Sequence, residues 1–171
     1  PFFSRPAPAD DAAASALAAA FWQLGYSRVA VVYVNNAYGS SWTHAFENAC
    51  ADANITVLSA AFDDAPGGAA LQTAVDAAVR RTKASGALVV VAVFLTVETV
   101  VWLAAAAAVH GMLTPRNMWV TLVDDPNLAD ESFPQHRASV REFLRGSLAL
   151  GVTIPTGAEN PRFQALVRRY A

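Results

Sequence analysis

Polar side chains follow the ends of apolar, β-branched runs in this sequence, and they are the residues that could do chemistry. Asn35 comes directly after the run Arg28–Val34, and Tyr38 and Ser40 lie in the turn that follows. Thr96 follows another such run. Amides and hydroxyls can hydrogen-bond a small polar ligand, and an aromatic ring can hold a cation over its face. These residue types therefore indicate a binding site.

Two neighbouring carboxylates follow a further apolar run, residues 118–123. Asp124 and Asp125 stand there, directly before Pro126. One interpretation is that they are turn residues that end a strand. The other is that one of them captures a ligand amine.

The turn around Tyr38 also supports two interpretations. Tyr38 either packs at the start of a helix or presents its ring to a cation, a contact that contributes roughly 0.5–2 kcal/mol. Ser40 and Ser41 are expected to cap the next helix, and backbone amides at that helix start could receive a ligand anion.

The elements that must position these residues alternate between strand-like and helix-like patterns. Strands are expected at 28–34, 55–62, 87–95, 118–123 and 147–154, and helices at 10–24, 39–53, 69–85, 96–110, 139–144 and 161–170. A β-then-α rhythm implies a parallel sheet, and right-handed crossovers place helices on both of its faces. The sequence predicts one α/β domain over residues 1–171: a three-layer α/β/α sandwich with a mainly parallel, doubly wound, Rossmann-like sheet.

In such a sheet the carboxyl ends of all strands meet at one edge, where open α/β folds bind ligands. The strand ends Asn35 and Asn36, Asp63, Thr96 and the pair Asp124 and Asp125 should therefore form one polar rim together with Tyr38.

Composition and motifs exclude several function classes. The formal net charge is −2, and Lys and Arg form no cluster, which argues against a nucleic-acid partner. No GxGxxG, P-loop lysine or GxSxG elbow is present, and the three histidines are not spaced as metal ligands. We expect no cofactor, no metal and no enzymatic activity.

The nearly apolar stretch 87–113 is long enough to cross a membrane, but its pattern predicts otherwise. A β-branched run is followed by Thr96, a candidate helix N-cap, with Glu98 in the first turn and a stop at His110-Gly111. A strand, a turn and a helix are expected here.

Three further features bear on the protein's location. The single cysteine, Cys50, is either a small buried hydrophobe on a helix or half of a disulfide whose partner lies outside the chain. Asn54-Ile55-Thr56 matches the N-glycosylation acceptor. The opening Pro-Phe-Phe, without methionine or signal peptide, predicts that the chain is part of a longer protein.

The order of the motifs resembles the ligand-binding region of type I periplasmic-binding-protein-like receptors. This family includes natriuretic-peptide receptors, class C G-protein-coupled receptors, the amino-terminal domains of ionotropic glutamate receptors and bacterial branched-chain amino-acid binding proteins. The matching motifs are Phe2-Phe3-Ser4-Arg5, Pro8-Ala9-Asp10, Leu24-Gly25-Tyr26, Asn36-Ala37-Tyr38-Gly39, Arg145-Gly146 and Pro161-Arg162-Phe163. The family usually has Phe-Phe-Arg, whereas Ser4 interrupts it here.

The resemblance implies that the chain is the second lobe of a bilobal, Venus-flytrap domain. Such a domain would be the extracellular or periplasmic sensor of a receptor, closing around an amino acid or amine by hinge motion and passing a signal on. In amino-acid-binding members, the ligand contacts of this lobe correspond to Asp10, Tyr38 and either Asp124 or Asp125. Its partners would be the small ligand, the missing first lobe and possible second copies in a homodimer.

Two alternatives keep the same fold. The domain could be a protein–protein interaction or dimerisation module without a ligand, in which case a large exposed apolar patch should replace the polar rim. It could also be a soluble solute-binding protein of an uptake system.

Overall fold

The structure is a computed structural model that describes residues 10–64, 67–93, 96–121 and 133–149. Within these ranges, a five-stranded parallel sheet has the strand order β2-β1-β3-β4-β5. The strands are β1 (Arg28–Val34), β2 (Thr56–Phe62), β3 (Val89–Val93), β4 (Met118–Thr121) and β5 (Ser147–Ala149). The helices are α1 (Asp10–Gln23), α2 (Ala37–Asp52), α3 (Gly68–Ala84), α4 (Val97–Val109) and α5 (Arg137–Arg145), with a 3₁₀ turn at Pro134–His136.

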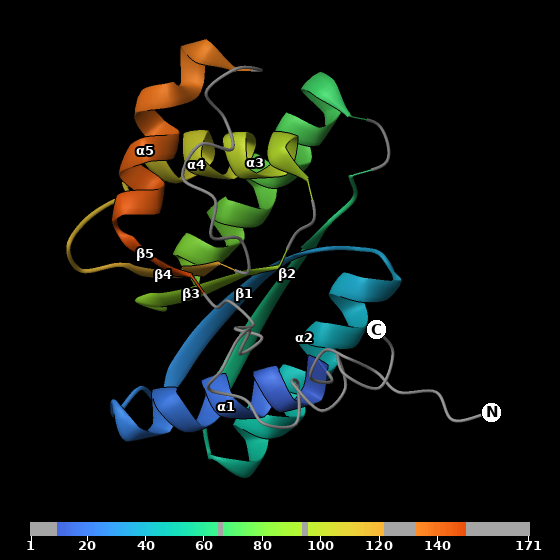
Figure 1. Ribbon diagram of the computed structural model, residues 1–171, viewed down its shortest axis with the longest axis vertical. Coiled ribbons are helices and arrows are strands. Elements are labelled where there is room, and N and C mark those ends of the chain that lie inside the picture. Colours follow the sequence, from blue (N-terminus) through green and yellow to red (C-terminus); the bar gives the residue numbers. More distant parts are fainter. Residues whose placement is uncertain (1–9, 65–66, 94–95, 122–132, 150–171) are drawn as a thin grey trace, which may run out of the picture.

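Helices cover both faces of the sheet, as predicted. Figure 1 shows α1 and α2 on one face and α3, α4 and α5 on the other. Successive strand side chains point to opposite faces. In β1, Val29 and Val31 accordingly join the core under α1 and α2, whereas Ala30 and Val32 join the core under α3 to α5. The fold is a three-layer α/β/α sandwich with a Rossmann-like, doubly wound sheet.

The order in which the parallel strands are added to the sheet reverses at β1. The chain passes from β1 to β2 on one side and then crosses back to β3 on the other side of β1. Strand order therefore switches between β1 and β3. In open α/β sheets the crevice at such a switch point, beyond the carboxyl ends of the strands, is where ligands bind.

Most elements lie close to their expected positions, but the start of α2 was predicted wrongly. The helix begins at Ala37, and its N-cap is Asn36. Ser40 and Ser41 therefore lie inside the first helical turns and do not cap the helix. Thr96, by contrast, is the N-cap of α4, as predicted.

The apolar stretch 87–113 forms β3, a turn and α4, as expected, apart from residues 94 and 95, which are outside the described ranges. No helix among the described residues is long and apolar enough to cross a membrane. The predicted helix at 161–170 and the end of the strand predicted at 147–154 also fall outside the described residues.

Candidate functional site

The topology brings the starts of four helices to the carboxyl edge of the sheet. Helices α2, α3 and α4 each follow a parallel strand and therefore begin at that edge. Helix α1 precedes β1 through a short connection, and its 14 residues span about 21 Å, close to the length of the seven-residue β1. The backbone of Asp10, at the start of α1, therefore lies at the same edge as Asn35.

The β1–α2 turn is fixed by the side chain of Asn36. Its Oδ1 accepts a hydrogen bond from the Gly39 N–H at 2.8 Å, and its carbonyl accepts one from the Ser40 N–H at 2.9 Å. Because Asn36 satisfies the helix start, the side chains of Ser40 and Ser41 are not needed there, and both residues are exposed. Tyr38 is half-buried and packs partly against the core under α1 and α2.

Gly39 lets the turn lie directly against the end of β1. A Cβ built on Gly39 would lie 2.0 Å from the carbonyl oxygen of Val34. Any residue with a side chain would clash there, so this position requires glycine. The Tyr-Gly pair is therefore a close-approach motif. The missing side chain of Gly39 sets the distance between α2 and the strand, and thereby positions Tyr38.

A second contact joins the ends of β1 and β2. The main-chain N–H of Asn35 donates to the Phe62 carbonyl at 2.7 Å, and its side-chain amide donates to Asp63 Oδ1 at 2.9 Å. Both Asn35 and Asp63 are exposed. Sequence reasoning placed Asp63 at a strand end but not among the ligand residues. Its position after β2 was the available signal.

Thr96 caps α4, and Glu98 in the first turn of α4 reaches the start of α3. Thr96 Oγ1 accepts the Thr99 N–H at 3.3 Å and lies 2.7 Å from Thr99 Oγ1. Glu98 accepts hydrogen bonds from the Gly68 N–H at 2.8 Å and from Trp102 Nε1 at 3.2 Å. The carboxylate of Glu98 thus fills the anion position at the start of α3, where the helix dipole favours negative charge.

The structure brings together four of the predicted site residues. Asn35 directly follows β1, Tyr38 and Ser40 lie in the first turn of α2, and Thr96 caps α4 after the adjacent strand, β3. The switch point between β1 and β3 lies between these two groups. For Asp10 the backbone position is described and the side chain is not. Asp124 and Asp125 lie outside the described residues.

Asn54, the glycosylation candidate, lies apart from this rim. It is an exposed residue with φ of 58° in the turn between α2 and β2, at the amino edge of the sheet.

Within the described ranges, no group of three or more His, Cys, Asp or Glu side chains could hold a metal ion. The described part of the rim carries hydroxyls, amides, the phenol of Tyr38 and the carboxylate of Asp63, which suit the binding of a polar small molecule.

Comparison with known proteins defines the class. Residues 1–170 match the family described as the receptor family ligand-binding region. The chain therefore belongs to this family of ligand-binding regions, which has the type I periplasmic-binding-protein fold. No curated protein sequence matches the chain significantly.

Two solved structures illustrate the likeness. An extracellular ligand-binding receptor from Verminephrobacter eiseniae superposes with a TM-score of 0.61 at 18% identity, over 97% of this chain and 46% of that one. An ABC transporter substrate-binding protein from Desulfitobacterium hafniense, in complex with Leu, superposes with a TM-score of 0.50 at 19% identity, over 67% of this chain and 32% of that one. The chain thus spans less than half the length of either protein, and at these identities the likeness shows the fold.

Proposed function

We propose that the chain is the second lobe of a bilobal ligand-binding region, which closes around a small molecule bearing an amine, such as an amino acid. Family membership over residues 1–170 supports this proposal, as does the chain's coverage of less than half of two ligand-binding neighbours. One of these neighbours was solved with leucine. We further propose that the lobe works outside the cytoplasm, in the ectodomain of a signalling receptor.

The polar rim at the switch point between β1 and β3 is the observation that carries the proposal. It lies where open α/β sheets bind ligands. The large exposed apolar side chains of the described residues lie elsewhere. Trp22, Leu24, Leu88 and Val109 lie at the amino edge, where α1 and α4 end and β3 begins, and Leu148 lies on β5. A polar rim of this kind favours a ligand over a protein partner at the cleft.

Each rim residue has a proposed role. The ring of Tyr38 faces the ligand cation, and Asp10 together with Asp124 or Asp125 binds the amine. Asn35, Ser40 and Thr96 hydrogen-bond the other polar groups of the ligand. Binding, and not catalysis, is the proposed activity, because these groups form no nucleophile–base pair.

The test is a thermal-shift screen of the two-lobe ectodomain against the twenty amino acids and small primary amines. A ligand at 100 times its Kd stabilises the folded state by about 2.7 kcal/mol, so a specific compound should raise the midpoint clearly. Tyr38→Ala and Asp125→Asn should remove the ligand-induced shift. Tyr26→Ala is the matched control, since Tyr26 is a half-buried tyrosine at the amino edge. It lowers the starting midpoint but should leave the ligand-induced shift intact.

A well-folded sample that shifts with none of these compounds would contradict the ligand proposal and favour an interaction module. A shift that survives in both rim variants would place the ligand elsewhere.

A further inference from the structure

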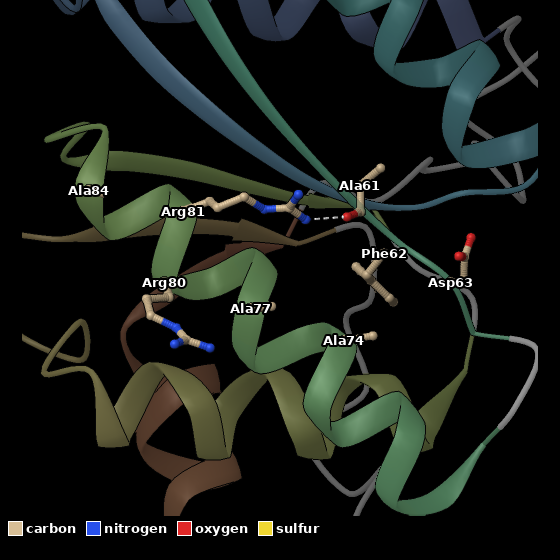
Figure 2. A pocket seen from close by; sticks show the side chains of 8 residues that line it. All are labelled: Ala61, Phe62, Asp63, Ala74, Ala77, Arg80, Arg81 and Ala84. Atoms are coloured by element: carbon tan, nitrogen blue, oxygen red, sulfur yellow. Dashed lines mark hydrogen bonds between the residues drawn. The ribbon is translucent and has the colours of Figure 1, made fainter.

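A groove of about 510 Å³ lies beside the sheet, between the outer edge of β2 and α3. Figure 2 shows its lining: three residues at the end of β2 and five along α3. The α3 wall carries alanines at positions 74, 77 and 84, which leave the space open, and the arginines Arg80 and Arg81. This groove lies on the β2 side of the sheet, away from the switch point between β1 and β3.

Among the described strands, β2 lies at an edge of the sheet, so half of its main-chain groups face away from the other strands. The Thr56 N–H bonds to the Ser27 carbonyl, and the Phe62 carbonyl accepts from Asn35. Residues of even number therefore pair with β1. By alternation, the N–H and C=O groups of Val57, Ser59 and Ala61 point away from the sheet, and no strand of the described residues pairs with them.

A charged side chain hydrogen-bonds to one of these outward-facing main-chain groups. Arg81 Nη2 donates to the Ala61 carbonyl at 2.6 Å, which is the dashed contact in Figure 2. Arg80 is engaged by Asp76 at 3.1 Å, and Asp76 also bonds His110 at 2.7 Å. The Asp63 carboxylate, held by Asn35, points away from α3 in Figure 2. Among the charges that line the groove, the Arg81 guanidinium is the one with no carboxylate beside it.

We propose that the outer edge of β2 and this groove dock an extended, acidic segment of a partner protein, which adds as a sixth strand next to β2. A partner N–H replaces Arg81 on the Ala61 carbonyl, and the released guanidinium binds a partner carboxylate. All hydrogen-bonding groups remain satisfied in this exchange, and Arg81 gains a charge-assisted pair in place of a neutral acceptor. Main-chain pairing supplies affinity, and the charge supplies specificity.

A second copy of the chain fits this edge less well. The carboxylate in the groove lining of a second copy is that of Asp63, which Asn35 already holds, so that lining offers Arg81 no free carboxylate. An acidic partner has the complementary charge. The proposed docking site lies at the outer edge of β2 and does not depend on the ligand proposed for the rim.

The test uses a fluorescein-labelled peptide that alternates Thr and Val around a central Glu, and a matched peptide with a central Gln. Binding to the chain is followed by fluorescence anisotropy. We expect the Glu peptide to bind at least about tenfold more tightly than the Gln peptide, and Arg81→Gln to remove that difference. Arg116→Gln, an exposed arginine in the turn before β4, should change nothing.

Ser59→Pro tests the strand pairing itself. Proline removes an N–H that faces outward, so the pairing of β2 with β1 is kept while the added strand is blocked. Ser59→Ala is its control, because it loses the same hydroxyl bond to Glu47 but keeps the N–H. Peptide binding should be lost in Ser59→Pro and kept in Ser59→Ala, with both variants checked for a cooperative unfolding transition.

Three results would overturn the proposal. They are the absence of saturable binding of either peptide up to about 1 mM, binding that persists in Ser59→Pro, and a dimer in sedimentation that Ser59→Pro abolishes. The last result would assign the edge to a second copy of the chain.

Discussion

Gly39 and Asn36 together make the turn that presents Tyr38. The amide oxygen of Asn36 closes the first turn of α2, and the absence of a side chain on Gly39 lets that turn touch the Val34 carbonyl. Neither residue has to contact a ligand for the rim to depend on it. Asn36 and Gly39 therefore set the geometry of the turn, whereas Tyr38 supplies the group proposed to contact the ligand.

We expect Gly39→Ala to destabilise the fold by about 1–3 kcal/mol, because the new Cβ would overlap the Val34 carbonyl and force α2 away from β1. Urea unfolding measures the change. Gly146→Ala is the matched control, since its Cβ would lie 3.6 Å from the nearest atom, and we expect a change within about 0.5 kcal/mol. Equal midpoints for the two variants would contradict this account of the Tyr-Gly turn.

Cys50 is buried on α2, which confirms its interpretation as a small buried hydrophobe. Burial, and next the nearby carboxylate of Glu47, raise the pKa of the thiol from 9.0 to about 12. The thiolate is the reactive form. Native Cys50 should therefore resist iodoacetamide at pH 8 and react only after unfolding. Rapid alkylation of the native chain would contradict this expectation.

The same raised pKa predicts a loss of stability in alkali. Between about pH 9 and 12 the unfolded thiol loses its proton while the folded one keeps it, so the free energy of unfolding falls as pH rises. Wild type should lose more stability than Cys50→Ala over this range, measured by urea unfolding at each pH. Parallel curves for the two proteins would show that Cys50 does not titrate differently on folding.

At the scale of the element, the helices of the rim begin at side-chain caps. Asn36 caps α2 and Thr96 caps α4, each accepting the N–H three residues later. The start of α3 lacks a side-chain cap of its own and instead uses Glu98 of α4. Two of these starts are therefore fixed locally, whereas the third depends on the packing of α3 beside α4.

Asn36→Ala should cost about 1 kcal/mol, because the Gly39 N–H loses its acceptor at the start of α2. Asn36→Asp retains an acceptor and should restore most of the stability. Thermal and urea unfolding of the two variants measure the difference. If alanine and aspartate behave alike, the cap does not hold the turn.

At the scale of the whole molecule, the rim forms one wall of the proposed cleft. Pockets typically bury about 70–90% of a small ligand, which one lobe cannot do alone. The 171-residue chain by itself should therefore bind leucine and other amino acids weakly or not at all, by isothermal titration calorimetry. Sub-micromolar affinity of the isolated chain would contradict the two-lobe proposal.

The sequence by itself determined the layers of this protein and part of its rim. The β-branched run Arg28–Val34, the N-cap Thr96 and the helix expected at 69–85 are local patterns, and the structure confirms each of them. They could be predicted because neighbouring residues decide them through backbone sterics, capping and the burial of one face.

The tertiary structure decided what depends on distant residues. Asn36 and the two serines are all good N-caps, and the close approach of Gly39 to Val34 selects Asn36. The bond between Asn35 and Asp63 joins residues 28 apart in sequence, and the one between Glu98 and Gly68 joins residues 30 apart. Such pairs depend on strand order and helix packing. Local periodicity carries no information about which strands become neighbours.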